Sequence, residues 1–318
     1  MSATPRAFAI SITPFAEAGE LDEARFRAHL RRLADAGIGI YVGGAGSGEG
    51  YTLSRDETRK LLEIAVDEVK GTVPIRAMGV EPRTADQMVD FLKLAEACGV
   101  DAAQVYSLDV GHGHAPRPDE LKAYYGEVLG AVSIPLVFST HQSVGYVIPP
   151  EVIFALFKEH DNLIDLNCSH QDISYLTSLI EGLKGRANIF VGGPHQATLC
   201  LSLGGYGFLT SEANIAPNLC MTVVNCYEAG DMHGMFNAYG KVIRLFTTTY
   251  ANGGIRAAKA VLNAHGVAGG WPRRPRLPIE DDALQAVLKV IRDEKIDAIE
   301  NWHEWQFKDE AVFTTAIS

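Results

Sequence analysis

The chain has 318 residues and a net charge of −11; 47% of its residues are hydrophobic and 21% are charged. These values are ordinary for a soluble globular protein, whereas nucleic acids and anionic membranes bind to basic surfaces. No apolar run approaches the roughly 18 residues that cross a bilayer, and the N-terminus lacks the layout of a secretory signal. We therefore expect a cytoplasmic protein with no nucleic-acid or membrane partner, in which the 5 scattered cysteines are free thiols.

Short apolar segments alternate with amphipathic ones over the first two thirds of the chain. Eight apolar segments are predicted as strands, over residues 8–15, 38–42, 74–80, 102–107, 135–140, 163–167, 187–193 and 207–211. Helices are predicted between them from hydrophobic periodicity and from start signals. These signals are a capping box at Ser54 and Glu57, the Pro149-Pro150 pair, and Asp172. Further helices are predicted over residues 219–229, 233–250, 255–265 and 281–297.

This alternation indicates parallel βαβ units, and eight of them match the usual size of a closed barrel. An open doubly wound sheet is the main alternative, but no GxGxxG motif follows the first strand. We predict an α/β fold: a (β/α)8 TIM barrel over residues 1–217 with a C-terminal helical extension over residues 218–318. The extension is expected to pack on the barrel as part of one structural unit.

Several short motifs resemble those of one family in their order and spacing over nearly the whole chain. They are Ile12-Thr13-Pro14-Phe15, Gly48-Glu49 followed by Thr52-Leu53-Ser54, Gly99-Val100-Asp101-Ala102 and Gly204-Gly205-Tyr206-Gly207. With these motifs the chain resembles the dihydrodipicolinate synthase / N-acetylneuraminate lyase family. The resemblance implies a homo-oligomer, a dimer or tetramer. It also implies a family whose enzymes condense or cleave 2-oxo acids through a lysine imine.

At most of the family's catalytic and substrate-binding positions, this chain has a different type of residue. The family's carboxylate-binding loop corresponds to Ala45-Gly46-Ser47-Gly48-Glu49, in which Glu49 is expected to orient the loop amides. The proton-shuttling tyrosine corresponds to Phe138 or, with a one-residue gap, to Ser139, and a second tyrosine corresponds to Val110. The lysine corresponds to Asn167. The resulting candidates for substrate binding are Gly46, Ser47, Glu49, Phe138, Ser139 and, on the eighth strand, Phe208.

An imine requires a nucleophilic amine, and the amide of Asn167 is neither basic nor nucleophilic. Every lysine in the sequence is predicted to be helical or helix-terminal, so none is expected to point from a strand into the barrel mouth. We therefore predict chemistry without a lysine imine and expect no true dihydrodipicolinate synthase activity.

Polar residues follow strands four to seven at the end of the barrel where active sites are built. They are Asp109, His112, His114, His141, Cys168, His170 and His195. Histidine transfers protons near neutral pH and is the commonest metal ligand. The catalytic candidates are His141 and His170 as acid and base, Asn167 as a donor to an oxyanion, and His112 and His114 as residues that close over the site.

Three functions remain open. The first is a lyase of aldolase or hydro-lyase type that acts on a small oxo- or hydroxy-carboxylate through histidine acid/base chemistry. The second is the same type of reaction assisted by a divalent metal that stabilises an enolate, although the sequence requires no cofactor. Its candidate ligands are His112, His114, His141, His170 and His195, with Asp109 or Glu49. The third is a catalytically inactive family member that binds or senses a small carboxylate.

Overall fold

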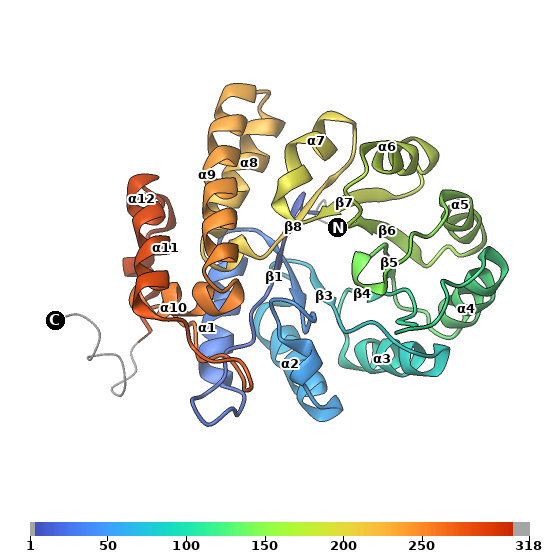
Figure 1. Ribbon diagram of the computed structural model, residues 1–318, viewed down its shortest axis with the longest axis horizontal. Coiled ribbons are helices and arrows are strands. Elements are labelled where there is room, and N and C mark those ends of the chain that lie inside the picture. The colour runs from blue at the N-terminus through green and yellow to red at the C-terminus, as the bar shows by residue number, and fades with distance from the viewer. Residues whose placement is uncertain (1–3, 308–318) are drawn as a thin grey trace.

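The computed structural model describes residues 4–307, and eight parallel strands in it form a closed barrel (Figure 1). The strands are β1 (Ala7–Ile10), β2 (Gly39–Val42), β3 (Ile75–Ala77), β4 (Ala102–Val105), β5 (Leu136–Ser139), β6 (Leu163–Cys168), β7 (Asn188–Gly192) and β8 (Gly207–Thr210). Each strand pairs with the next in the chain, and β8 pairs with β1. The predicted (β/α)8 TIM barrel is therefore confirmed.

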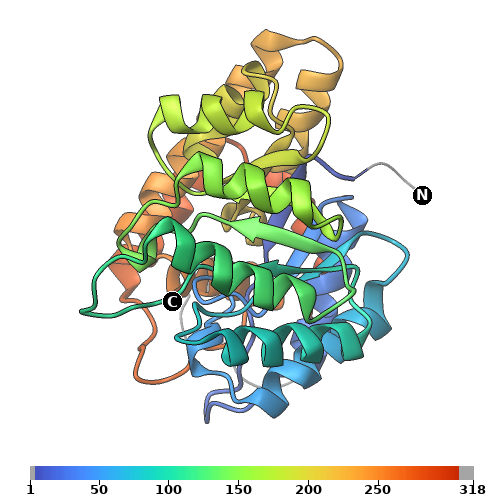
Figure 2. The same cartoon turned by 90° about the vertical axis from the view of Figure 1, so that its right-hand side faces the viewer.

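Helices surround the barrel and continue beyond it. They are α1 (Glu23–Asp35), α2 (Arg55–Val69), α3 (Ala85–Cys98), α4 (Pro118–Gly130), α5 (Pro150–Glu159), α6 (Ile173–Gly182), α7 (Ala197–Ser202), α8 (Pro217–Glu228), α9 (Met232–Ala251), α10 (Ile255–Ala264), α11 (Asp281–Asp293) and α12 (Asp297–Glu300). Figure 2 shows helices of the outer layer lying side by side over the strands. Five short 3₁₀ helices are η1 (Gly50–Thr52), η2 (Gln142–Val144), η3 (Pro194–Gln196), η4 (Glu212–Asn214) and η5 (Trp302–Trp305).

The helix starts agree with the signals in the sequence. Ser54 caps α2 and forms the capping box with Glu57, and Asp172 accepts hydrogen bonds at the start of α6. α5 begins at Pro150, where proline loses no helical hydrogen bond. These local interactions fix where each helix leaves the end of the preceding strand.

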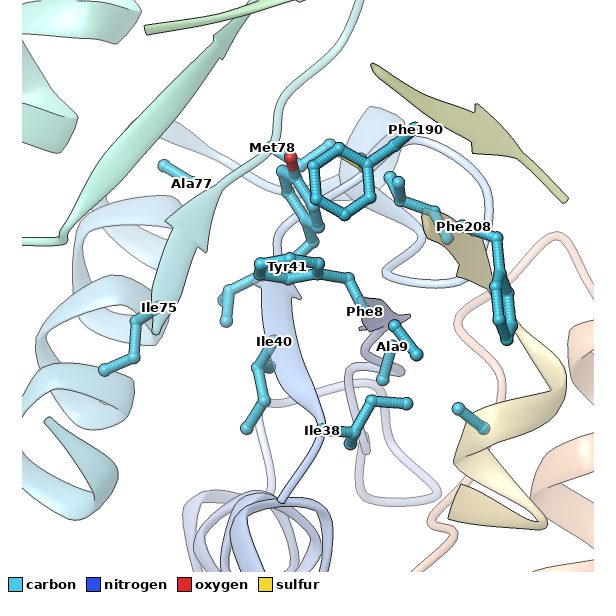
Figure 3. Packing of buried hydrophobic residues seen from close by; sticks show 14 of the residues in the cluster. Phe8, Ala9, Ile38, Ile40, Tyr41, Ile75, Ala77, Met78, Phe190 and Phe208 are labelled. Carbon is cyan, nitrogen blue, oxygen red and sulfur yellow. The ribbon is translucent and has the colours of Figure 1, made fainter. Parts of the chain in front are cut away.

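The barrel interior holds aromatic side chains and one buried ion pair. Phe8, Tyr41 and Phe190 gather inside the barrel (Figure 3), and the Arg76 guanidinium lies 4.3 Å from the centre of the Phe8 ring. Arg76 on β3 pairs with Asp165 on β6, and both side chains are almost fully buried. A buried charge is tolerated only with such a partner, so this pair ties opposite strands together.

The helices after α8 form the C-terminal part, in which α9 lies against α8 along one side of the barrel (Figure 1). α8 itself follows β8 as the helix of the eighth βα unit; the division at residue 217 stays a prediction. Among the described residues, no helix has both the length and the apolar character of a membrane span. The five cysteines are free thiols, as expected.

Candidate functional site

The loop that follows β2 leaves several hydrogen-bond donors unused. Within residues 4–307, the N–H groups of Gly46, Ser47 and Gly48 donate to no backbone oxygen, and the Ser47 hydroxyl has no hydrogen bond. The loop is tightly folded, since a Cβ on Gly48 would lie 2.8 Å from the carbonyl oxygen of Gly44. Successive free amides in such a turn form a concave binding site for an anion.

Glu49 holds this loop from behind. Its backbone adopts a left-handed φ of 50°, and its carboxylate is completely buried. The carboxylate pairs with Lys259 on α10 and accepts a hydrogen bond from the N–H of Arg273 at 3.1 Å. Glu49 therefore anchors this end of the loop to α10 and to the N–H of Arg273, while its role in orienting the loop amides stays a prediction. Its assignment as a substrate-binding residue is wrong, because no part of the carboxylate is accessible to a ligand.

Lysine amines lie outside the barrel interior. Among residues 4–307, none of the eight strands carries a lysine, and Lys259 is the buried lysine. Its amine donates to Glu49 and to the carbonyl oxygens of Thr13 and Trp271, at 2.8 and 2.9 Å. Burial lowers the pKa of Lys259 to about 8, although Glu49 opposes this shift. Because the amine is enclosed and fully hydrogen-bonded, it is not placed to attack a substrate.

Asn167 lies on β6 inside the barrel, but its amide hydrogens are already used. Its Nδ2 donates to the hydroxyl of Tyr41 at 3.1 Å and to the Oε1 atom of Gln104 at 2.5 Å. Its Oδ1 atom is buried and has no partner among the described residues. The expectation that Asn167 donates to an oxyanion is therefore wrong, since the side chain has only an acceptor left to offer.

Strand alternation separates the two candidates on β5. Ser139 pairs in register with Asn167, whose side chain points into the barrel, and so occupies the inward position. Phe138 points outward and packs on Tyr125 of α4 and Phe157 of α5, with ring centroids 4.7 and 6.3 Å away. Phe138 is therefore a core residue, and its assignment to substrate binding is wrong.

Phe208 is also a core residue. On β8 it pairs with Ala7 of β1 and Val191 of β7, the strand neighbours of the inward-facing Phe8 and Phe190. Because adjacent residues of a strand face opposite sides, Phe208 faces the outer helices, and Figure 3 shows it pointing away from Phe8 and Phe190. Its assignment to substrate binding is therefore wrong, because the side chain packs in the core outside the barrel interior.

His141, after β5, belongs to a polar cluster with Glu81 and Ser143. Its Nδ1 contacts a carboxylate oxygen of Glu81 and lies 2.7 Å from the Ser143 hydroxyl, which donates to the same Glu81 oxygen at 2.7 Å. Burial alone would raise the pKa of Glu81, but the hydrogen bonds from His141 and Ser143 hold it below its usual value. Since a carboxylate only accepts, Nδ1 carries the hydrogen and Nε2 is the basic nitrogen.

Glu81 and Ser143 did not emerge from the sequence as candidates. Glu81 follows the third strand, at the same end of the barrel as the polar residues that follow strands four to seven. This position after a strand is the feature of the sequence that could have identified Glu81 as a candidate. The contact with His141 spans 60 residues of sequence, so only the closed barrel brings the two side chains together.

The other histidines do not join this cluster. His112 and His114 are exposed on the loop after β4, and His170 accepts a hydrogen bond from the N–H of Asp172 at 3.2 Å. His195 packs against Phe246 of α9. Within residues 4–307, no three histidine, cysteine or acidic side chains are grouped to hold a metal ion. The prediction that His112, His114, His141, His170 and His195 join Asp109 as metal ligands is therefore wrong for the described part of the chain.

Two cavities, each of about 490 Å³, open beside the loop that follows β2. The first, here the Glu81 cavity, is lined by Ala45, Tyr51, Val80, Glu81, Arg83, Gln87, Asp109, Ser143 and Val144. The second, here the Ser47 cavity, includes Gly46, Ser47, Ser211, Glu212, Phe246, Thr249, Arg256 and Arg276 in its lining. The loop thus contributes to both cavities, and we take them together as the candidate active site.

Comparison with known proteins agrees with this architecture. Residues 4–294 match the model of the dihydrodipicolinate synthetase family. The chain belongs to this family. A 4-hydroxy-tetrahydrodipicolinate synthase of Hyphomonas neptunium is 30% identical over 284 residues, which cover 87% of this chain and 93% of the relative. The synthase of the same name from Methanopyrus kandleri is 26% identical, with coverage of 88% and 93%.

Solved structures of the dihydrodipicolinate synthetase fold superpose closely on the protein. A dihydrodipicolinate synthase from Thermotoga maritima has a TM-score of 0.84 at 19% identity, covering 92% of this chain and 99% of that one. A Clostridium difficile protein in complex with mannosamine has a TM-score of 0.83 at 22% identity, with coverage of 91% and 98%. At these identities the likeness establishes the shared fold.

Proposed function

We propose that the protein is a lyase that acts on a small oxo- or hydroxy-carboxylate without forming a lysine imine. His141 is the acid and base of the reaction, and the amides and hydroxyl at Gly46 and Ser47 hold the substrate carboxylate. The observation that carries this proposal is the contact of His141 Nδ1 with Glu81 and Ser143. It leaves Nε2 as the basic nitrogen, without a hydrogen-bond partner within residues 4–307.

The two parts of the proposed site adjoin each other. Ala45 lines the Glu81 cavity together with Glu81 and Ser143, while the next two residues of its loop line the Ser47 cavity. The N–H of Ala45 also donates to the carbonyl oxygen of Gly79 at 3.2 Å, which ties this loop to the segment that carries Glu81. The proposal therefore places the acid across Ala45 from the cavity that Glu81 and Ser143 line. Glu81 and Ser143 act as positioning residues, because they fix the ring and its tautomer.

Replacement of His141 by asparagine tests the proposal. General acid/base catalysis is worth roughly 100-fold to 10,000-fold, so we expect the variant to lose at least about 100-fold in kcat. Turnover is measured on a panel of small 2-oxo and hydroxy acids as loss of substrate and appearance of the cleavage or dehydration product. Glu81→Gln should lower kcat less and change its pH profile, while the exposed His233→Asn on α9 serves as the matched control.

Full turnover by the His141→Asn variant would contradict the proposal. So would a mass increase on any lysine after borohydride reduction in the presence of pyruvate, since this marks an imine. Melting temperatures raised by these acids, without turnover by the wild-type protein, would favour the inactive family member that binds or senses a carboxylate. True dihydrodipicolinate synthase activity is not part of the proposal, while the cytoplasmic location and homo-oligomeric assembly stay predictions.

A further inference from the structure

The Ser47 cavity contains two arginines whose charge is not neutralised by a carboxylate. Arg256 is half-buried at the start of α10, and Arg276 lies exposed before α11. Within residues 4–307, Arg256 donates only to the carbonyl oxygens of Gly253 and Leu277, at 3.3 and 3.4 Å. Arg276 lies over the Tyr51 ring, 5.1 Å from its centre. Both guanidinium groups therefore retain donors for an anionic ligand.

The rest of the cavity adds little negative charge. Glu212 is the acidic side chain in its lining, and its carboxyl group accepts hydrogen bonds from the Thr210 and Ser211 hydroxyls at 2.7 and 2.8 Å. Burial raises the pKa of Glu212, which favours its neutral form. By contrast, Arg273 on the segment that carries Arg276 is bound to the Glu57 carboxylate. The Ser47 cavity is therefore positive on the side formed by α10 and the segment before α11.

We propose that the Ser47 cavity binds acids with two anionic groups, one on the Gly46–Ser47 loop and the other on Arg256 and Arg276. The inference deepens the proposed function and rests on it for the position of the first carboxylate. Guanidinium groups bind carboxylates and phosphates through paired, charge-assisted hydrogen bonds, so the second anion is a carboxylate or a phosphate. The substrate class is thus a short dicarboxylate or a phosphorylated small acid.

Calorimetric titration with acids of matched length tests this inference. Glutarate and valerate have chains of equal length but two and one carboxylates, and phosphoglycolate and glycolate form the corresponding pair for phosphate. We expect the wild-type protein to bind the dianion of at least one pair about tenfold more tightly than its monoanion. The double variant Arg256→Met/Arg276→Met should lose this preference and keep its affinity for the monoanions. The better of the two dianions identifies the class of the second group.

Two variants separate this inference from the proposed function. Arg274→Met removes an exposed arginine of the same run that does not line the cavity, and it should keep the preference for dianions. Ser47→Ala should weaken both members of each pair. Equal binding of dianion and monoanion, or a preference that survives in the double variant, overturns the inference alone. Absence of binding by all four acids overturns the inference and the carboxylate site at Gly46 and Ser47, while the turnover assay of His141→Asn still tests the proposed acid and base.

Discussion

At the scale of single residues, the conformation of the loop that follows β2 depends on the ion pair between Glu49 and Lys259. A left-handed backbone costs a residue other than glycine of order 1 kcal/mol, and an unpaired buried carboxylate costs several more. Lys259 and the N–H of Arg273 offset both energies, because they pair with the buried Glu49 carboxylate. The pair therefore holds the Glu49 end of this loop against α10.

A double-mutant cycle should measure this coupling. Glu49→Gln and Lys259→Met each leave one buried partner unmatched and should each lower the free energy of unfolding by about 3 kcal/mol. The double variant should lose less than the sum of the two, by about 2 kcal/mol, in urea denaturation. The exposed pair Lys289–Asp293 on α11 gives the matched control, with a coupling well below 1 kcal/mol. Additive losses for Glu49 and Lys259 would contradict the coupling.

The sequence identified one member of the proposed catalytic cluster and missed the other two. His141 was found because histidine after a barrel strand is a recognisable pattern, whereas a lone glutamate or serine in a polar loop is not. Asn167 was located correctly on the sixth strand, but its hydrogen bonds to Tyr41 and Gln104 come from strands distant in sequence. Roles that depend on such contacts require the three-dimensional structure.

At the scale of elements, the alternation of β5 determines which side chain packs between the outer helices and which lies inside the barrel. Phe138→Ala should lower the free energy of unfolding by about 3–5 kcal/mol, because it empties a site between α4 and α5. Its affinity for small acids should be unchanged. Ser139→Ala removes a hydroxyl inside the barrel without emptying a core site, so it should change stability little. Urea denaturation and calorimetry measure the two properties.

Phe138→Leu provides a milder variant of the same change in case the alanine variant does not fold. It should show a smaller loss of stability and again unchanged binding. If Phe138→Leu weakens acid binding, or if Ser139→Ala lowers stability more than Phe138→Leu does, the assignment of the two faces of β5 is incorrect.

Hydrophobic periodicity predicts which segments are strands and helices better than it predicts the residues at which they end. The first strand is predicted over residues 8–15 but ends at Ile10. The N–H of Ser11 still donates to Tyr41 of β2, whereas the N–H of Ile12 donates to the side chain of Asn214 at 2.9 Å. The helix predicted over residues 281–297 ends at Asp293, since Lys295 adopts a left-handed φ of 55°. Neither a distant side-chain contact nor a single backbone angle can be read from hydrophobic periodicity.

At the scale of the whole molecule, the C-terminal part is joined to the barrel through a buried carboxylate. Glu300, at the end of α12, accepts hydrogen bonds from the N–H groups of Asn218 and Leu219 at 3.2 and 2.8 Å. These are free amides of the first turn of α8, where a negative charge is favourable. Nearby, Trp302 packs on the His265 ring with a centroid distance of 3.8 Å. Residues about 80 positions apart thus hold the last helices against the eighth βα unit.

This contact should make stability depend on pH. Burial raises the pKa of Glu300 from 4.5 to about 7, against the opposing effects of Arg32 and the α8 amides. Between these two values the folded protein binds more protons at this site than the unfolded chain does. The free energy of unfolding therefore falls as pH rises through this window. A shift of this size corresponds to a loss of about 3 kcal/mol once the pH exceeds 7.

Glu300→Gln isolates this effect because the amide has no charge to bury. Unfolding free energies of the variant and the wild-type protein are measured in urea from pH 4.5 to 8. The variant should gain about 3 kcal/mol relative to wild type over this range. His29, whose pKa burial lowers to about 3, acts in the opposite direction, but it is present in both proteins and cancels in the difference. The exposed Glu304→Gln on η5 is the control; a wild-type-like pH profile for Glu300→Gln would exclude Glu300 as the titrating group.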